Sequence, residues 1–291
     1  MLSAEHKLRF LTIERDGRAE PAAEFDGEII SLSRAGIGST IELMAGGADA
    51  MDEVTRWIPH AIASERWPAD QVKLLAPIPR PPKVICIGLN YRDHAAETRM
   101  PIPEVPTVFA KFPTAVIGPR HPIVLPKNST KPDYEAEFVV VIGKRGRHIP
   151  EERWREHVFG YSIMNDVSAR DFQMATTQWM MGKTFDTFAP LGPAIVTADE
   201  IPDPQALAIS MTVSGELLQQ SNTREMIFPV SRLIAFLSSV FTLEVGDVIA
   251  TGTPAGVGFV RKPPRWLRPG DEAVVRVEGI GELVNPVVAE P

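Results

Sequence analysis

A switch from acidic to apolar residues at 133–143 constrains the fold of this 291-residue chain more than any other stretch. The segment reads DYEAEFVVVIG, and its β-branched run, closed by a glycine, predicts a buried strand over 138–143. Because side chains alternate faces along a strand, we expect Glu135 and Glu137 to point the same way, about 7 Å apart along the backbone. Two carboxylates therefore stand side by side at the mouth of a buried strand.

A third carboxylate, Asp166, directly follows a second predicted strand at 158–164. If the two strands pair, Asp166 converges on both glutamates. Three packed anions repel by roughly 4 kcal/mol per pair at about 4 Å and an effective dielectric constant of about 20, so a positive charge is needed among them. A donor set of oxygens alone favours Mg²⁺ or Mn²⁺ over zinc or copper, and open positions on such an ion suit catalysis. The ordinary alternative is a solvated outer strand face.

Five motifs follow one another in a fixed order: GLNYxxHxxE at 88–97, DYEAE at 133–137, NDVSARDxQ at 165–173, GKTFDT at 182–187 and TGTPxGVG at 251–258. In that order they resemble the fumarylacetoacetate hydrolase superfamily over about residues 80–290. Two further runs are typical of one branch of this superfamily: DTFAPLGP at 186–193 and RKPP at 261–264. That branch contains the fumarylacetoacetate hydrolase domain-containing 2 proteins and bacterial acylpyruvate hydrolases.

The resemblance implies an α+β, β-rich fold with a mixed β-sandwich/roll catalytic domain. A stiff proline-rich connector at 74–82 separates two parts, so we expect a small N-terminal α/β lobe at 1–75 and the catalytic domain at 76–291. In the lobe, two Asp-Gly pairs predict tight hairpins and apolar spacing predicts a helix over 51–64. Patterning also predicts a strand at 83–88, a hairpin at 207–219, a helix at 230–239 and strands at 274–277 and 283–285.

The resemblance implies that Glu135, Glu137 and Asp166 hold Mg²⁺ or Mn²⁺. His94 and Glu97 lie three residues apart on a predicted helix over 91–98, so they share one face and can meet. A carboxylate that orients an imidazole raises its basicity, which makes the pair a candidate base for activating water. The alternative is a surface His–Glu contact without catalytic meaning.

Four further residues are candidates for contacts with the substrate. Lys183 follows a glycine and is placed to stabilise an oxyanion or pair with a substrate carboxylate, and a Schiff base is the alternative. By resemblance, Arg170 and Gln173 contact the substrate; a capping or ion-pair role on their shared helical face is the alternative. Thr253 sits in a loop of small residues from which its hydroxyl can reach a substrate carboxylate.

The resulting hypothesis is hydrolysis of a C–C bond in a short acylpyruvate or 1,3-diketo acid, giving pyruvate and a carboxylic acid. In it, His94 held by Glu97 deprotonates the attacking water. Decarboxylation of oxaloacetate and isomerisation of a hydroxymuconate-like compound stay open, since both pass through a similar enolate. A binding protein that keeps the fold without catalysis is a third possibility of a different class.

Composition restricts the partners and the compartment. A formal net charge of −7 and a pI near 5.5 argue against nucleic acid or an anionic membrane as a partner. The single cysteine, Cys86, excludes an internal disulfide and is expected to be buried and inert. Residues Met1–Lys7 lack the apolar core of a signal peptide, so we expect a cytoplasmic location. A homodimer is expected from the resemblance alone.

Overall fold

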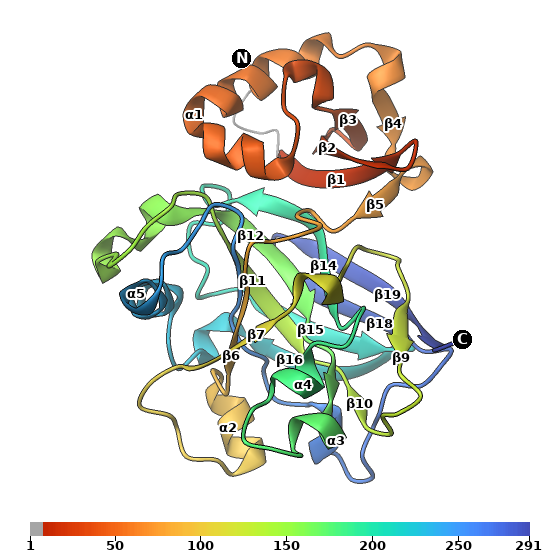
Figure 1. The fold of residues 1–291 in the computed structure, drawn as a ribbon, viewed down its shortest axis with the longest axis vertical. Coiled ribbons are helices and arrows are strands. Elements are labelled where there is room, and N and C mark those ends of the chain that lie inside the picture. Colours follow the sequence, from red (N-terminus) through yellow and green to blue (C-terminus); the bar gives the residue numbers. More distant parts are fainter. Residues whose placement is uncertain (1–7) are drawn as a thin grey trace.

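The computed structural model describes residues 8–291, and within that range a mixed sheet of 12 strands crosses the whole molecule (Figure 1). Its order is β4 (Arg66–Pro68), β3 (Glu28–Ser31), β2 (Arg18–Phe25), β1 (Arg9–Arg15), β14 (Ala189–Thr197), β12 (Val158–Asn165), β11 (Ala136–Ile142), β17 (Val248–Ala250), β6 (Val84–Gly88) and β7 (Thr107–Lys111). Off this path, β5 (Lys73–Leu75) pairs with β1 and β8 (Val116–Ile117) pairs with β14. The expected β-rich mixed fold is confirmed.

A second sheet packs on one face of the first. Its order is β16 (Glu216–Asn222), β15 (Ala208–Val213), β18 (Glu272–Val277), β19 (Gly281–Ala289) and β9 (Ile123–Leu125), and β10 (Pro132–Asp133) pairs separately with β13 (Ser168–Ala169). One core cluster joins Phe138 and Ile163 of the large sheet to Met211 and Val275 of the small one. The neighbouring Val139 packs into a different cluster on the opposite face, which explains why the central strand is buried at every position and apolar from Phe138 to Ile142.

Helices of 4 to 18 residues accompany the sheets in the described part of the chain. They are α1 (Thr40–Trp57), α2 (Arg92–Thr98), α3 (Arg170–Gln173), α4 (Met180–Lys183) and α5 (Val230–Val240). Single 3₁₀ turns lie at Ser33–Ala35, Ile58–His60, Ala63–Glu65, Ala69–Gln71, Pro113–Ala115, Thr223–Glu225 and Gly258–Val260, with a longer one at Glu151–His157. Among the described residues, no helix is both long enough and apolar enough to cross a membrane.

The predicted helix over 51–64 is wrong in its bounds. Helix α1 begins at Thr40, where the Ser39 hydroxyl accepts a hydrogen bond from the backbone N–H of Glu42 at 3.1 Å. Gly47 then leaves helical geometry (φ 55°, ψ −135°), and the helix continues to Trp57. Two helical stretches therefore meet at a kink at the Gly-Gly pair, 46–47, and the prediction missed the first of them.

The N-terminal lobe, at the top of Figure 1, contains the two predicted hairpins. Asp16-Gly17 and Asp26-Gly27 form two-residue loops with positive φ at all four positions, as tight β-hairpins require. Strand β1 also pairs with β14, with Phe10 opposite Ile195, so the large sheet runs from the lobe into the rest of the chain. The division at 75/76 stays a prediction, and the expectation for Met1–Lys7 lies outside the described residues.

Candidate active site and metal centre

Three buried carboxylates meet where β11 begins and the neighbouring β12 ends. The two strands are antiparallel with Ala136 opposite Asn165, which brings Glu135 and Glu137 next to Asp166. Each of the three offers an oxygen, and these oxygens all lie within 4.8 Å of one another. The structure therefore brings together the three residues that the sequence singled out as ligands.

Cations hold two of these carboxylates but not the third. Lys183 Nζ lies 2.6 Å from Glu135 Oε2 and 2.8 Å from Asp166 Oδ2. Lys111 Nζ lies 2.5 Å from Asp166 Oδ1, and Arg170 pairs with Glu135 Oε1 at 2.7 Å. Within residues 8–291, Glu137 accepts a single hydrogen bond, from the backbone N–H of Gly252 in the loop after β17 to its Oε2 at 2.9 Å. Among the described residues, no lysine or arginine forms an ion pair with Glu137, so its negative charge is poorly compensated.

The pKa values of the two glutamates move apart for this reason. Burial by itself raises the pKa of Glu135, but Lys183 and Arg170 outweigh it and bring that pKa well below its usual range. Burial together with the negative charges of Asp166 and Glu135 raises the pKa of Glu137 well above its usual range. A cation bound beside Glu137 would stabilise its charged form and lower its pKa again.

The donor set fits a divalent metal ion. It consists of three carboxylates, buried and convergent, which are ligands of hard cations such as Mg²⁺ and Mn²⁺. Together with Asp133, which also pairs with Arg170, the three carboxylates carry four negative charges when ionised, against the three positive charges of Lys111, Lys183 and Arg170. One negative charge is left over, which a bound cation would compensate. The described residues form a divalent metal site.

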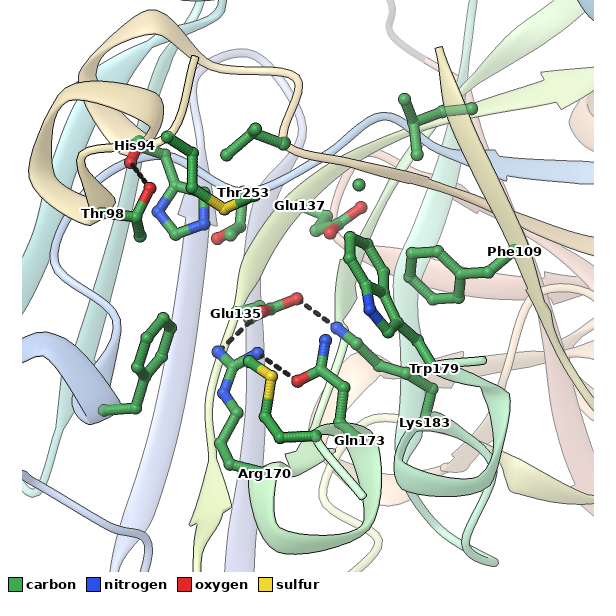
Figure 2. A pocket seen from close by; sticks show the side chains of 16 residues that line it. His94, Thr98, Phe109, Glu135, Glu137, Arg170, Gln173, Trp179, Lys183 and Thr253 are labelled. Atoms are coloured by element: carbon green, nitrogen blue, oxygen red, sulfur yellow. Dashed lines mark hydrogen bonds and ion pairs between the residues drawn. The ribbon is translucent and has the colours of Figure 1, made fainter. Parts of the chain in front are cut away.

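The predicted histidine–glutamate pair forms on α2, and His94 faces the same pocket (Figure 2). His94 Nδ1 lies 2.7 Å from Glu97 Oε1, and Glu97 Oε2 accepts the backbone N–H of Gly256 at 2.9 Å. Because Glu97 accepts at Nδ1, the imidazole carries its proton there, and Nε2 is the free basic nitrogen. The pair is not a surface contact, since only 8% of His94 is exposed.

Helix α2 is fastened to the rest of the site at its start. Asn90 Nδ2 donates to the carbonyl oxygen of Thr251 at 2.7 Å and to that of Phe228 at 3.1 Å. Arg92 donates to the carbonyl oxygen of Met226 at 2.7 Å. These bonds hold a helix of seven residues that would be marginal alone.

Arg170 and Gln173 share one helical face, as expected, and contact each other, while Arg170 also has the ion-pair role given as the alternative, with Asp133 and Glu135. Arg170 donates from Nε to Asp133 Oδ2 and from one terminal nitrogen to Gln173 Oε1, both at 2.8 Å. Asp133 also accepts the backbone N–H groups of Gly258 at 2.7 Å and Phe259 at 3.1 Å. Sequence reasoning did not single out Asp133, although it stands two residues before the first ligand.

Lys111 is the other residue that sequence reasoning missed. It ends the edge strand β7, its side chain is fully buried, and it also donates to the carbonyl oxygen of Val167 at 3.0 Å. A lysine at the end of an apolar strand is usually exposed. Its burial depends on a partner, Asp166, that lies 55 residues along the chain.

The remaining candidate, Thr253, lies at the opposite wall. Its hydroxyl oxygen accepts a hydrogen bond from Gln219 Nε2 at 2.9 Å, so the hydroxyl hydrogen is left to donate. Cys86 lies under the site, fully buried, and burial raises the pKa of its thiol well above the usual value, as expected for an inert cysteine.

One small pocket unites these groups (Figure 2), with a cavity volume of about 70 Å³. Its polar lining comprises His94, Thr98, Glu135, Glu137, Arg170, Gln173, Lys183 and Thr253, and its apolar lining comprises Ile87, Gly88, Leu89, Met100, Phe109, Met174, Trp179 and Phe259. Carboxylates, an imidazole and cationic groups thus face one shared pocket.

This fold and this buried acidic triad define a metal-binding enzyme. The chain belongs to the fumarylacetoacetate hydrolase family, because the family model described as fumarylacetoacetate (FAA) hydrolase C-terminal matches residues 83–288. The resemblance expected from the five motifs is confirmed.

Known relatives span more than one activity. Oxaloacetate tautomerase FAHD2B, mitochondrial, from Bos taurus is 49% identical over 223 residues, which cover 76% of this chain and 71% of that protein. A fumarylacetoacetate hydrolase structure from psychrophilic Exiguobacterium antarcticum has a TM-score of 0.85 at 39% identity, covering 97% of this chain and 100% of that one. Maleylpyruvate hydrolase from Sphingobium sp. SYK-6, solved with manganese(II) and pyruvate, has a TM-score of 0.83 at 30% identity, with 97% and 100% covered.

Proposed function

We propose that this chain catalyses proton transfer at C3 of short 2-oxo acids, interconverting the keto and enol forms of a substrate such as oxaloacetate. The observation that carries the proposal is the meeting of the His94–Glu97 pair with the buried carboxylate triad in one small pocket. Enol–keto conversion needs one base and a means of stabilising an enolate. The name of the 49% identical relative, an oxaloacetate tautomerase, supports this activity.

Glu135, Glu137 and Asp166 would hold the metal ion, which we propose is Mg²⁺ or Mn²⁺. Such an ion supplies Lewis acidity that stabilises negative charge on the 2-oxo group. The maleylpyruvate hydrolase structure, whose title names manganese(II) and pyruvate, supports both the ion and the substrate class.

His94 moves the proton. With Nδ1 engaged by Glu97, its Nε2 accepts a proton from C3 of the keto form, and the electron pair of the C–H bond becomes the enolate. The resulting imidazolium is stabilised by Glu97, which the backbone of Gly256 holds in place. Return of a proton to the substrate oxygen completes the enol, and the reverse sequence gives the ketone.

Three further polar side chains of the pocket bind the charged ends of the substrate. Lys183 places an ammonium beside Glu135 and Asp166, where it stabilises the developing enolate charge. Arg170 keeps N–H groups beyond those given to Asp133, Glu135 and Gln173, and these can bind a carboxylate. The hydroxyl hydrogen of Thr253 offers one more donor.

Hydrolysis of an acylpyruvate is the second candidate, and the likeness to maleylpyruvate hydrolase favours it. The same residues would serve, but His94 would take its proton from a water that attacks the distal carbonyl. The bond between C3 and C4 would then break, releasing a carboxylic acid and the enolate of pyruvate.

A panel of three substrates separates these activities. Oxaloacetate, acetylpyruvate and fumarylpyruvate are each mixed with protein in Mg²⁺, in Mn²⁺ and in EDTA, while enol absorbance and pyruvate release are followed together. The proposal predicts rapid metal-dependent equilibration of oxaloacetate enol without pyruvate release. Pyruvate from the diketo acids, with oxaloacetate equilibrating no faster than in buffer, would establish the hydrolase instead. Pyruvate from oxaloacetate would indicate a decarboxylase.

A further inference from the structure

The indole of Trp179 rests directly on the backbone of Gly88, at the end of β6. A β-carbon built at Gly88 would lie 2.2 Å from Cζ3 of Trp179 and 3.0 Å from its Cη2. No ordinary side-chain contact is that short, so the ring occupies the space that any larger residue at position 88 would need. Both residues line the pocket.

A second ring fixes the orientation of the indole. Phe109 of β7 packs edge-on against Trp179, with ring centroids 5.8 Å apart and an interplanar angle of 68° (Figure 2). The same phenyl ring lies 5.0 Å from the Lys183 ammonium. Trp179 is therefore part of the wall next to the reacting groups, although it directly follows an exposed segment, Met174 to Gln178.

Because the pocket is small, the position of Trp179 affects which substrates can enter it. The cavity is small, about 70 Å³, so the large side chains of its lining limit what can lie beside the triad. Trp179 is the largest apolar side chain in its lining, and its seat on Gly88 leaves the ring no room to move toward β6. A longer substrate tail would have to displace this ring.

We propose that Trp179, seated on Gly88, is the specificity-determining residue that restricts the site to 2-oxo acids with a short group beyond C3. This inference rests on the proposed function, since it presumes that a 2-oxo acid binds between the triad and His94. It defines the substrate class by length: four-carbon acids are accepted, and acids with extended acyl tails are excluded.

Binding of substrate analogues tests the inference without relying on turnover. Oxamate and N-butyloxamate share the 2-oxo acid head and differ in their tails. Their Kd values are measured by calorimetry with Mg²⁺-loaded wild type, Trp179→Ala and a control, Trp154→Ala, whose indole lies outside the pocket. We expect Trp179→Ala to improve the binding of N-butyloxamate relative to oxamate by roughly 10- to 100-fold, and the control to leave the ratio unchanged.

The possible failures are distinguishable. If oxamate does not bind the wild type, the proposed function and the inference fall together. If oxamate binds wild type and variant alike but the ratio does not change, the inference alone is overturned.

Substitution at Gly88 tests the contact between the Trp179 indole and the Gly88 backbone. Gly88→Ala should lower the melting temperature and also relax the length preference, because the new methyl group displaces the indole. Adding Trp179→Ala should restore the melting temperature of Gly88→Ala toward that of Trp179→Ala alone. Additive losses in the double variant would contradict the contact.

Discussion

Lys111→Met should destabilise the protein strongly in EDTA, and much less when a divalent metal ion is bound. The ammonium of Lys111 is completely buried and lies 2.5 Å from Asp166 Oδ1. Methionine keeps the length and the apolar contacts of the side chain but removes its charge. Asp166 then keeps a buried negative charge with one cation, Lys183, in place of two.

The magnitude follows from the remaining partners. Removing one partner of a buried ion pair costs about 3–5 kcal/mol, because the other charge stays buried without compensation. Lys183, 2.8 Å from Asp166 Oδ2, keeps part of that compensation, so we expect a loss of about 3 kcal/mol. For a chain of this size the loss corresponds to about 6 °C in melting temperature. A bound cation replaces the missing positive charge and should recover much of it.

Thermal unfolding in EDTA and in saturating Mn²⁺ checks this prediction. Lys73→Met is the matched control, because Lys73 pairs with Glu14 at a similar distance, 2.8 Å, on the surface. An exposed pair contributes less than about 1 kcal/mol, and Mn²⁺ should not change its effect. Equal melting temperatures for the two variants in EDTA would refute the assignment of Lys111 as the buried counter-ion of Asp166.

Two further predictions concern the base and a peripheral ion pair. Glu97→Gln should lower kcat for enol–keto conversion by about 10²-fold with little change in the Kd for Mn²⁺, because it disturbs the orientation of His94 and leaves the ligands alone; an unchanged kcat would contradict the role of the pair. Burial raises the pKa of Asp271, but hydrogen bonds from Arg265 and neighbours outweigh this, so its pKa lies below the usual value. Its stabilising effect, about 1 kcal/mol, is therefore present above about pH 4 and lost as pH falls through the lowered pKa. The difference in urea midpoint between wild type and Asp271→Asn should shrink below pH 4. A difference that is independent of pH would contradict stabilisation by the ionised Asp271 carboxylate.

Local patterns predicted the centre of the fold and of the site. The β-branched run after Glu137 predicted β11, and the antiparallel pairing with β12 followed from two adjacent apolar strands, so the approach of Asp166 was foreseeable. The i, i+3 spacing of His94 and Glu97 was sufficient to predict their contact. Signals of this kind lie within one or two elements.

Long-range contacts were not readable in the same way. Lys111 and Asp133 owe their roles to partners brought close by the tertiary fold, and Lys111 has the pattern of an ordinary edge-strand lysine. The seat of Trp179 on Gly88 joins segments 91 residues apart, and nothing near either residue indicates it. The start of the lobe helix was predicted too late, at residue 51 instead of Thr40, although a local signal was present. Ser39 and Glu42 have the spacing of a helix N-terminus, and the Gly-Gly pair at 46–47 obscured it.

Roles and assembly stay predictions where only sequence supports them. The assignment of Thr253 to substrate binding, the homodimer and the cytoplasmic location belong to this group. The geometry of the pocket agrees with a substrate contact at Thr253, whose hydroxyl hydrogen is free to donate. Kinetics of a Thr253→Val variant would address the first of them.

The most direct test of the central claim is exchange of the C3 hydrogens of oxaloacetate for deuterium, followed by proton NMR in D₂O with Mg²⁺. The account predicts that the wild type accelerates exchange well above a control with Mg²⁺ and no protein. EDTA should abolish this acceleration, and His94→Asn should reduce it by about 10²-fold. Exchange at the rate of the control, with Mg²⁺ shown to be bound, would contradict proton transfer between C3 and His94.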